Sequence, residues 1–317
     1  MPNTASPTAA LSRRRAAISL ALGVFGISWS AILVRWTGVS GIVSAFYRLA
    51  FASLIFVPWR LVGSRQPIRA TRDGIGAALI AGVLFAADLA FFNSSVMATS
   101  AANAALLGVN APIFVALGTW LLYRERPAAR FWLGFLVALV GMIAIVGADV
   151  LVHPSLGFGD LLAVAGAFCY GLYLVCVQRG RSGLDTLTFS MCATATGAVC
   201  LLILALVTRQ PLTGFDGRSW AALIGLALVA QVFGQLCVAH ALGKLPATIT
   251  SIALLAQAPA TAILAWPLLG ERIHSGQLLG GALVLMGIAV VSAERFAPAL
   301  TPQMRTLVSD VHGDGAV

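Results

Sequence analysis

Residues 99–147 read TSAANAALLGVNAPIFVALGTWLLYRERPAARFWLGFLVALVGMIAIVG, and this stretch decides the fold because its pattern occurs twice in the chain. Ala111-Pro112 lies inside an apolar segment, and Glu125 precedes Gly134 and Gly141 by nine and sixteen positions. About 146 residues later the same order returns with the same two spacings, at Ala258-Pro259, Glu271, Gly280 and Gly287. Self-similarity at a fixed offset is the signature of duplication. The sequence therefore predicts two copies of one unit.

The composition places this unit in a membrane. Of 317 residues 59% are hydrophobic and 10% charged, against about 25% charged in an ordinary soluble domain. The net charge of +9 comes from short basic clusters between apolar runs, without the basic face of a nucleic-acid binder. The five cysteines lie in apolar runs without metal-ligand spacing, which indicates buried apolar side chains and no metal site.

Ten apolar segments are long enough to span a bilayer, which takes about 20 residues each. They run over 16–34, 41–59, 74–93, 101–121, 131–149, 161–177, 187–207, 219–241, 247–268 and 276–293. We interpret the first, which follows Arg13 to Arg15, as a retained helix and not a cleaved signal peptide. The predicted organisation is a tail (1–15), a repeat of five helices (16–149), a second such repeat (159–293) and a disordered tail (297–317).

The basic residues predict the orientation. With the amino terminus inside, fifteen Lys and Arg fall on inner segments and four on outer loops, while Arg48 lies within a span. This bias predicts both termini in the cytoplasm, and we expect an integral protein of a bacterial cytoplasmic (inner) membrane. Five spans per repeat is an odd number, so the second copy enters the membrane inverted. Inverted repeats around a midplane site are typical of secondary transporters, although duplication is also an economical way to build any large membrane protein.

The tandem units resemble EamA domains of the drug/metabolite transporter (DMT) superfamily over about 20–147 and 159–292. The matching residues are Gly26, Trp29, Phe46-Tyr47-Arg48, Pro112, Glu125, Gly159-Asp160, Tyr170, Tyr173, Pro259 and Glu271. The resemblance implies an all-α carrier of ten transmembrane helices with a central cavity and peripheral fifth and tenth helices. It implies no particular substrate.

Two charged residues, Arg48 and Asp88, lie within predicted spans. Such residues are costly in lipid and usually face an interior or a cavity. Their depths differ by about 3 Å at 1.5 Å per residue, so a mutual ion pair is sterically allowed. One hypothesis is that Arg48 binds a substrate anion while Asp88 is its counter-ion or a proton site. The alternative is a structural pair that holds two helices together.

The repeat also pairs two amides with two prolines. Asn110 precedes Pro112, and Gln257 precedes Pro259, by two positions. Each proline removes a backbone hydrogen bond, and interrupted helices at corresponding positions indicate a midplane site. The alternative is that the amides only join neighbouring helices.

Other candidates follow from their positions in the spans. Gln231 and Gln235 share one helix face, and His240 is a candidate proton relay or a surface residue. Trp29, Tyr47, Tyr170 and Tyr173 are cavity candidates, although aromatic residues also anchor span ends. Glu125 and Glu271 are interpreted as interfacial anchors with a gating role as the alternative.

The sequence favours a transporter over its rivals. No His-Glu-x-x-His, Gly-x-Ser-x-Gly or Walker loop occurs, so we expect no enzyme and no cofactor. A channel or receptor would need a polar pore or a ligand-binding part outside the membrane. We expect alternating-access transport of a small polar or amphipathic metabolite, anionic, zwitterionic or amino-acid-like, in a monomer or homodimer. Proton coupling is a candidate driving force, and multidrug export and a non-transporting receptor or scaffold are the alternatives.

Overall fold

The chain folds into a helical bundle, which a computed structural model describes over residues 7–63, 71–98, 110–124, 127–152, 157–269 and 275–296. The first half forms α1 (Pro7–Ser28), α2 (Ser30–Thr37), α3 (Gly41–Pro58), the π-helical η1 (Trp59–Gly63), α4 (Arg72–Ala98), α6 (Ala111–Tyr123) and α7 (Ala129–Val152). The second half forms α8 (Phe158–Gly183), α9 (Thr186–Val207), α10 (Gly217–Gly225), the π-helical η2 (Leu226–Gln235), α11 (Leu236–Leu242), α12 (Ala247–Leu254), α13 (Gln257–Leu269) and α14 (Ser275–Phe296). No strand occurs in these ranges.

These helices suit a bilayer. Six stretches in the described ranges are long and apolar enough to span one, and shorter apolar helices lie in the segments that contain α6, α7 and α14. Each of the ten predicted spans contains helix. The outward faces carry leucine, isoleucine, valine and phenylalanine, as lipid requires. The prediction of an all-α membrane protein is confirmed.

Three predicted spans, the first, the eighth and the ninth, are interrupted. The sequence predicted only the interruption of the ninth, from its proline. The first span breaks at Trp29 between α1 and α2, where the Ser28 hydroxyl donates to the Val24 carbonyl (2.7 Å). The Ser28 carbonyl accepts from Thr261 Oγ1 of α13 at 2.9 Å, so another helix replaces the lost bond. Such back-bonding by serine bends helices. The eighth span contains η2, and the ninth divides into α12 and α13.

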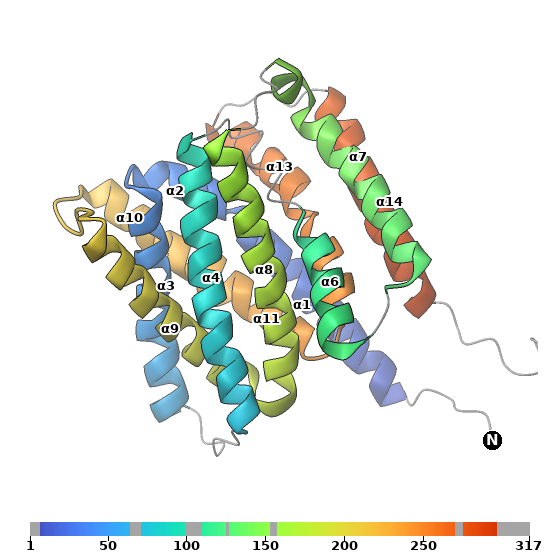
Figure 1. Cartoon of the computed structure of the whole chain (residues 1–317), viewed down its shortest axis with the longest axis horizontal. Helices are drawn as coiled ribbons and strands as arrows, with labels where there is room; N and C mark the ends of the chain where they lie inside the picture. Colours follow the sequence, from blue (N-terminus) through green and yellow to red (C-terminus); the bar gives the residue numbers. More distant parts are fainter. Residues whose placement is uncertain are drawn as a thin grey trace, which may run out of the picture.

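The packing follows the duplication. α4 of the first repeat lies along α8 of the second. Their counterparts in the duplicated pattern, the η2–α11 segment for α4 and α1 for α8, also lie together. Helices that correspond to one another pair directly: α3 packs on α9, and α7 on α14. Figure 1 shows α7 and α14 side by side at one edge of the bundle, apart from the helices that surround its centre. This exchange of partners is what two inverted repeats produce.

Two glycines bring α4 and α9 together beside the centre. A Cβ added to Gly82 would lie 2.5 Å from the Ala193 carbonyl oxygen, and one added to Gly197 would lie 3.0 Å from that of Gly82. Small residues allow such close approach between helices in membranes. The backbone of α9 is thereby held against α4, and two hydroxyl residues of α9, Ser190 and Thr194, line a space at the centre of the bundle.

Candidate substrate site

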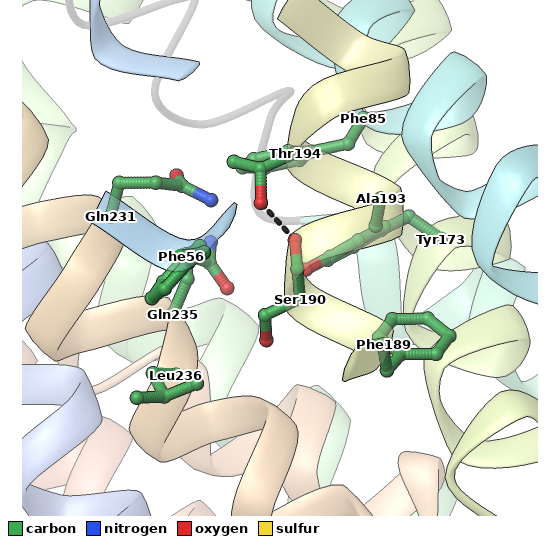
Figure 2. A pocket seen from close by; sticks show the side chains of 10 residues that line it. All are labelled: Phe56, Phe85, Tyr173, Phe189, Ser190, Ala193, Thr194, Gln231, Gln235 and Leu236. Carbon is green, nitrogen blue, oxygen red and sulfur yellow. Dashed lines mark hydrogen bonds between the residues drawn. The ribbon is translucent and has the colours of Figure 1, made fainter. Parts of the chain in front are cut away.

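The centre of the bundle contains a pocket between helices of both repeats (Figure 2). We call it the central pocket, and ten residues line it: Phe56, Phe85, Tyr173, Phe189, Ser190, Ala193, Thr194, Gln231, Gln235 and Leu236. They come from α3 and α4 of the first repeat and from α8, α9, η2 and α11 of the second. Aromatic rings and neutral polar groups alternate around the space, so it suits a solute with an apolar body and a polar group.

The central pocket is narrow in this conformation. Its volume is about 10 Å³, which is roughly what one water molecule needs. A metabolite could therefore enter only after side chains or helices move.

Arg48 connects four helical segments through contacts that include two residues of this pocket, Gln231 and Phe85. Its Nε donates to Gln231 Oε1 at 2.9 Å, and a terminal nitrogen donates to Ser30 Oγ at 3.1 Å. Its guanidinium carbon lies 5.6 Å from the centre of the Phe85 ring, a cation–π contact. The side chain is 5% exposed, so it is buried and well satisfied. Arg48 thus joins α3 to α2, α4 and η2.

The mutual ion pair of Arg48 and Asp88 is absent. Among the described residues no salt bridge or hydrogen bond reaches the Asp88 carboxylate, because Arg48 extends towards η2 and α2 instead. Asp88 is partly buried and near enough to Arg48, Tyr170 and Tyr173 to interact with them electrostatically. Asp88 does not line the central pocket, and its role as a counter-ion or proton site stays a prediction.

An aromatic stack forms one wall. The Phe85 and Tyr173 rings stack with centres 4.6 Å apart, and Tyr173 and Tyr170 stack at 5.7 Å. Tyr173 is buried and lines the pocket, whereas Tyr170 lies behind it with its hydroxyl within reach of the Gln235 side chain. These two predicted tyrosines therefore belong to one structural unit.

A groove lies near the pocket, at the end of the bundle where α3 and α8 end and α4 and α9 begin, the lower end in Figure 1. We call this the arginine-rich end, because Arg60, Arg72, Arg179 and Arg181 lie there. The groove has a volume of about 280 Å³ and is lined by Ser19, Trp59, Thr186, Leu187, Leu236, Cys237 and His240. Leu236 lines both spaces, so its side chain lies between the groove and the central pocket. His240 is exposed beside this groove.

A polar cluster joins η1, which follows α3, to the start of α9 at the same end. Arg60 Nε donates to Thr188 Oγ1 at 2.6 Å and lies 3.7 Å from Asp185 Oδ2. Asp185 caps α9, since its carboxylate accepts from the Thr188 backbone N–H at 3.0 Å and from the Thr188 hydroxyl at 2.5 Å. Burial by itself raises the pKa of Asp185, but the Thr188 hydrogen bonds and Arg60 outweigh it and bring that pKa below its ordinary value.

Aromatic residues cluster at the opposite end of the bundle. The Tyr47 hydroxyl donates to the Leu212 carbonyl at 2.5 Å, and its ring packs against Trp220 with centres 5.0 Å apart. Phe51 and Phe215 complete this outer cluster. Tyr47 therefore lies in a contact between α3 and the segment before α10, away from the central pocket.

The remaining predicted residues lie elsewhere. Trp29 sits at the α1–α2 break, packed with Leu33 and Leu226. Asn110 immediately precedes α6 and Gln257 begins α13, so Pro112 and Pro259 fall in the first turns of these helices, and neither amide lines the central pocket. Glu125 and Glu271 lie outside the described residues.

Sequence reasoning missed the contribution of α9. Ser190 and Thr194 line the central pocket one turn apart, and Phe189 lies beside them. The signal was present as hydroxyl residues at i and i+4 spacing in an otherwise apolar span. The phenylalanines gave no signal, because they are common in any lipid-facing helix.

A duplicated α-helical bundle with lipid-compatible outer faces and a pocket shared by its two halves defines a polytopic membrane protein of the carrier type. A sequence profile described as the EamA-like transporter family matches residues 14–147 and 157–293. The chain therefore belongs to the EamA-like transporter family and is a membrane transporter.

Curated relatives agree with this assignment, and a solved structure shares the fold. An uncharacterized transporter of Archaeoglobus fulgidus is 26% identical over 79% of this chain and 87% of its own. The uncharacterized transporter YdfC of Bacillus subtilis is 23% identical over 85% and 88%. A solved structure titled "Crystal structure of protein" superposes with a TM-score of 0.72 and 19% identity, covering 89% of this chain and 99% of that one, and shows the shared fold.

Proposed function

We propose that this protein is a secondary transporter that moves a small polar or amphipathic metabolite by alternating access. The observation that carries the proposal is the central pocket, in which both repeats contribute to a mixed wall of amides, hydroxyls and aromatic rings inside an apolar bundle. A site shared by two halves can open to either side as the halves rock.

The proposal includes an orientation. Both termini and the arginine-rich end lie in the cytoplasm, as the distribution of arginines indicates. The groove then opens inwards, and Leu236 separates it from the substrate. The partly buried Asp88 is the proposed proton site if transport is coupled to a proton gradient.

Transport by purified protein in liposomes tests this function. A mixed metabolite pool is offered with and without an imposed proton gradient, and the lumen is read by mass spectrometry. We expect saturable accumulation of at least one solute, with loss of that accumulation in a Gln231→Leu, Gln235→Leu double variant. Gln210→Leu is the matched control, because Gln210 lies in the segment after α9 and not in the pocket. If folded protein moves no solute under either condition, the transport proposal fails in favour of a receptor or scaffold.

Multidrug export is the second candidate, since Phe56, Phe85 and Phe189 supply apolar aromatic surface. A lipophilic cation such as ethidium in the same pool separates the two. Its movement in the double variant at the wild-type rate would favour drug export, because a lipophilic substrate does not need the amides.

A further inference from the structure

Two glutamines of η2 present different hydrogen-bonding groups to the central pocket, one a donor and the other an acceptor. Arg48 Nε donates to the Gln231 side chain, and arginine carries donors only. The atom of Gln231 that faces Arg48 must therefore be its oxygen, which leaves its NH₂ group on the other side. Figure 2 shows this nitrogen directed into the pocket. Gln231 thus offers a hydrogen-bond donor whose direction is determined by Arg48.

Gln235 offers an acceptor. Its Oε1 is buried and has no hydrogen-bond partner among the described residues, while the side chain is only 4% exposed. In Figure 2 this oxygen points towards Ser190 across the pocket. A buried acceptor without a partner is rare in proteins, and each instance requires an explanation. The rings of Phe56 and Phe189 carry no donor, and neither the Ser190 nor the Tyr170 hydroxyl forms a hydrogen bond with this oxygen.

We propose that Gln231 and Gln235 together bind a polar end of the substrate that carries a hydrogen-bond acceptor and a donor close together. A zwitterionic amino acid and a primary carboxamide share this chemistry. The acceptor of the substrate receives from Gln231, and its donor binds Gln235 Oε1, while its apolar part lies against the Phe85–Tyr173 stack. Arg48 acts as a positioning residue, because it orients the Gln231 amide. The inference rests on the proposed transport function and defines its substrate class.

The rigid placement of the pair supports this assignment. Both glutamines lie on η2, four residues apart, and π-helical segments are frequent at functional sites. Arg48 also anchors α2 through Ser30 and packs on Phe85, so the orientation of Gln231 depends on several helices at once. Direct binding of a substrate anion by Arg48 is a weaker assignment, since its guanidinium already donates to two side chains.

Four probes with one apolar body test the proposal. Leucine carries both groups as a zwitterion, and 4-methylpentanamide carries both as a neutral carboxamide. Isoamylamine carries the donor alone, and 4-methylpentanoate the acceptor alone. Each is titrated into the purified full chain in detergent, with binding read from the shift in melting temperature. We expect leucine, 4-methylpentanamide or both to bind about tenfold more tightly than either single-function probe, a ratio that one hydrogen bond supplies.

Variants test whether the tenfold preference for the paired probes depends on Gln235 and Arg48. In Gln235→Met the preference for the paired probes is expected to disappear, and in Gln235→Glu isoamylamine should gain affinity because the acceptor becomes anionic. Gln210→Met is the control.

Arg48→Lys retains the charge without the guanidinium that holds Gln231. The protein should still fold, but its preference for the paired probes over the single-function probes should fall. A wild-type ratio near one, or no binding of either paired probe, would overturn the proposal. Transport of some other solute in the liposome assay would then leave the transport function itself intact.

Discussion

At the scale of single residues, Asp185 gives a prediction about pH. Its pKa is lowered in the folded protein, since burial alone would raise it but the Thr188 hydrogen bonds and Arg60 outweigh that effect. A carboxyl group with a depressed folded pKa stabilises the protein above its unfolded pKa, about 3.9, and this stabilisation is lost as the pH falls through the folded value. Asp185→Asn retains a helix cap but not the charge. Wild type should therefore melt at a higher temperature than Asp185→Asn at neutral pH, and the two should converge below about pH 4.

Asp216 is the matched control for this titration, because it caps α10 through Ser219 (2.9 Å) without a buried arginine beside it. Asp216→Asn should change the melting temperature less than Asp185→Asn at neutral pH. Equal curves for wild type and Asp185→Asn from pH 7 to pH 3 would show that the Asp185 charge contributes nothing.

The sequence predicted some residues of the pocket and not their contacts. Gln231 and Gln235 could be assigned to one face because a four-residue spacing determines a helix face. The bond between Arg48 and Gln231 joins residues 183 positions apart, and no local pattern specifies it. Tyr47 shares the sequence context of Arg48, yet adjacent residues of a helix point in different directions, so Tyr47 reaches the outer cluster instead.

At the scale of helices, the pair of α7 and α14 depends on glycines. A Cβ on Gly141 would lie 2.5 Å from the Gly280 carbonyl oxygen and 2.8 Å from the Val284 nitrogen, both backbone atoms of α14. Gly141→Leu should therefore separate the two helices and lower the yield and melting temperature of the protein. Gly76→Leu is the control, because an added Cβ there meets nothing within 4 Å. Unchanged stability of Gly141→Leu, measured by fluorescence-detected gel filtration during heating, would contradict this packing.

Hydrophobic length predicted where helices lie but not where they are interrupted. The predicted span 41–59 agrees with α3, because proline, glycine and polar loops limit it at both ends. The π-helical η2 lies inside the continuous apolar run 219–241, where it packs against α1 and α3, and no local pattern in that run marks it. The α12–α13 interruption was predictable, since Pro259 cannot donate the backbone hydrogen bond of a continuous helix.

At the scale of the whole molecule, the duplication was visible in the sequence because the repeat spacings survive where residue identities do not. The pairing of α3 with α9 and of α7 with α14 follows from inverted symmetry. The asymmetry of this conformation does not follow from that symmetry. One end has a groove that reaches Leu236, and the other is closed by the cluster around Tyr47. Under the proposed alternating-access function the two copies exchange these states, so the sequence does not determine which end is closed in one conformation.

This asymmetry predicts the behaviour of Cys237, which lines the groove. With the other four cysteines replaced, Cys237 should react with a membrane-impermeant thiol reagent added to the cytoplasmic face of oriented vesicles and not with reagent added outside.

Tyr47→Phe removes the hydrogen bond to Leu212 at the outer end. Loss of about 1 kcal/mol should shift the equilibrium constant about fivefold towards the outward-open state, and cytoplasmic labelling should slow in proportion to the fraction of molecules that leaves the inward-open state. Thr208→Val is the control, because the Thr208 hydroxyl bonds only within α9. Unchanged labelling in Tyr47→Phe would mean that the outer cluster stabilises the fold without gating it, and labelling from outside would reverse the predicted orientation.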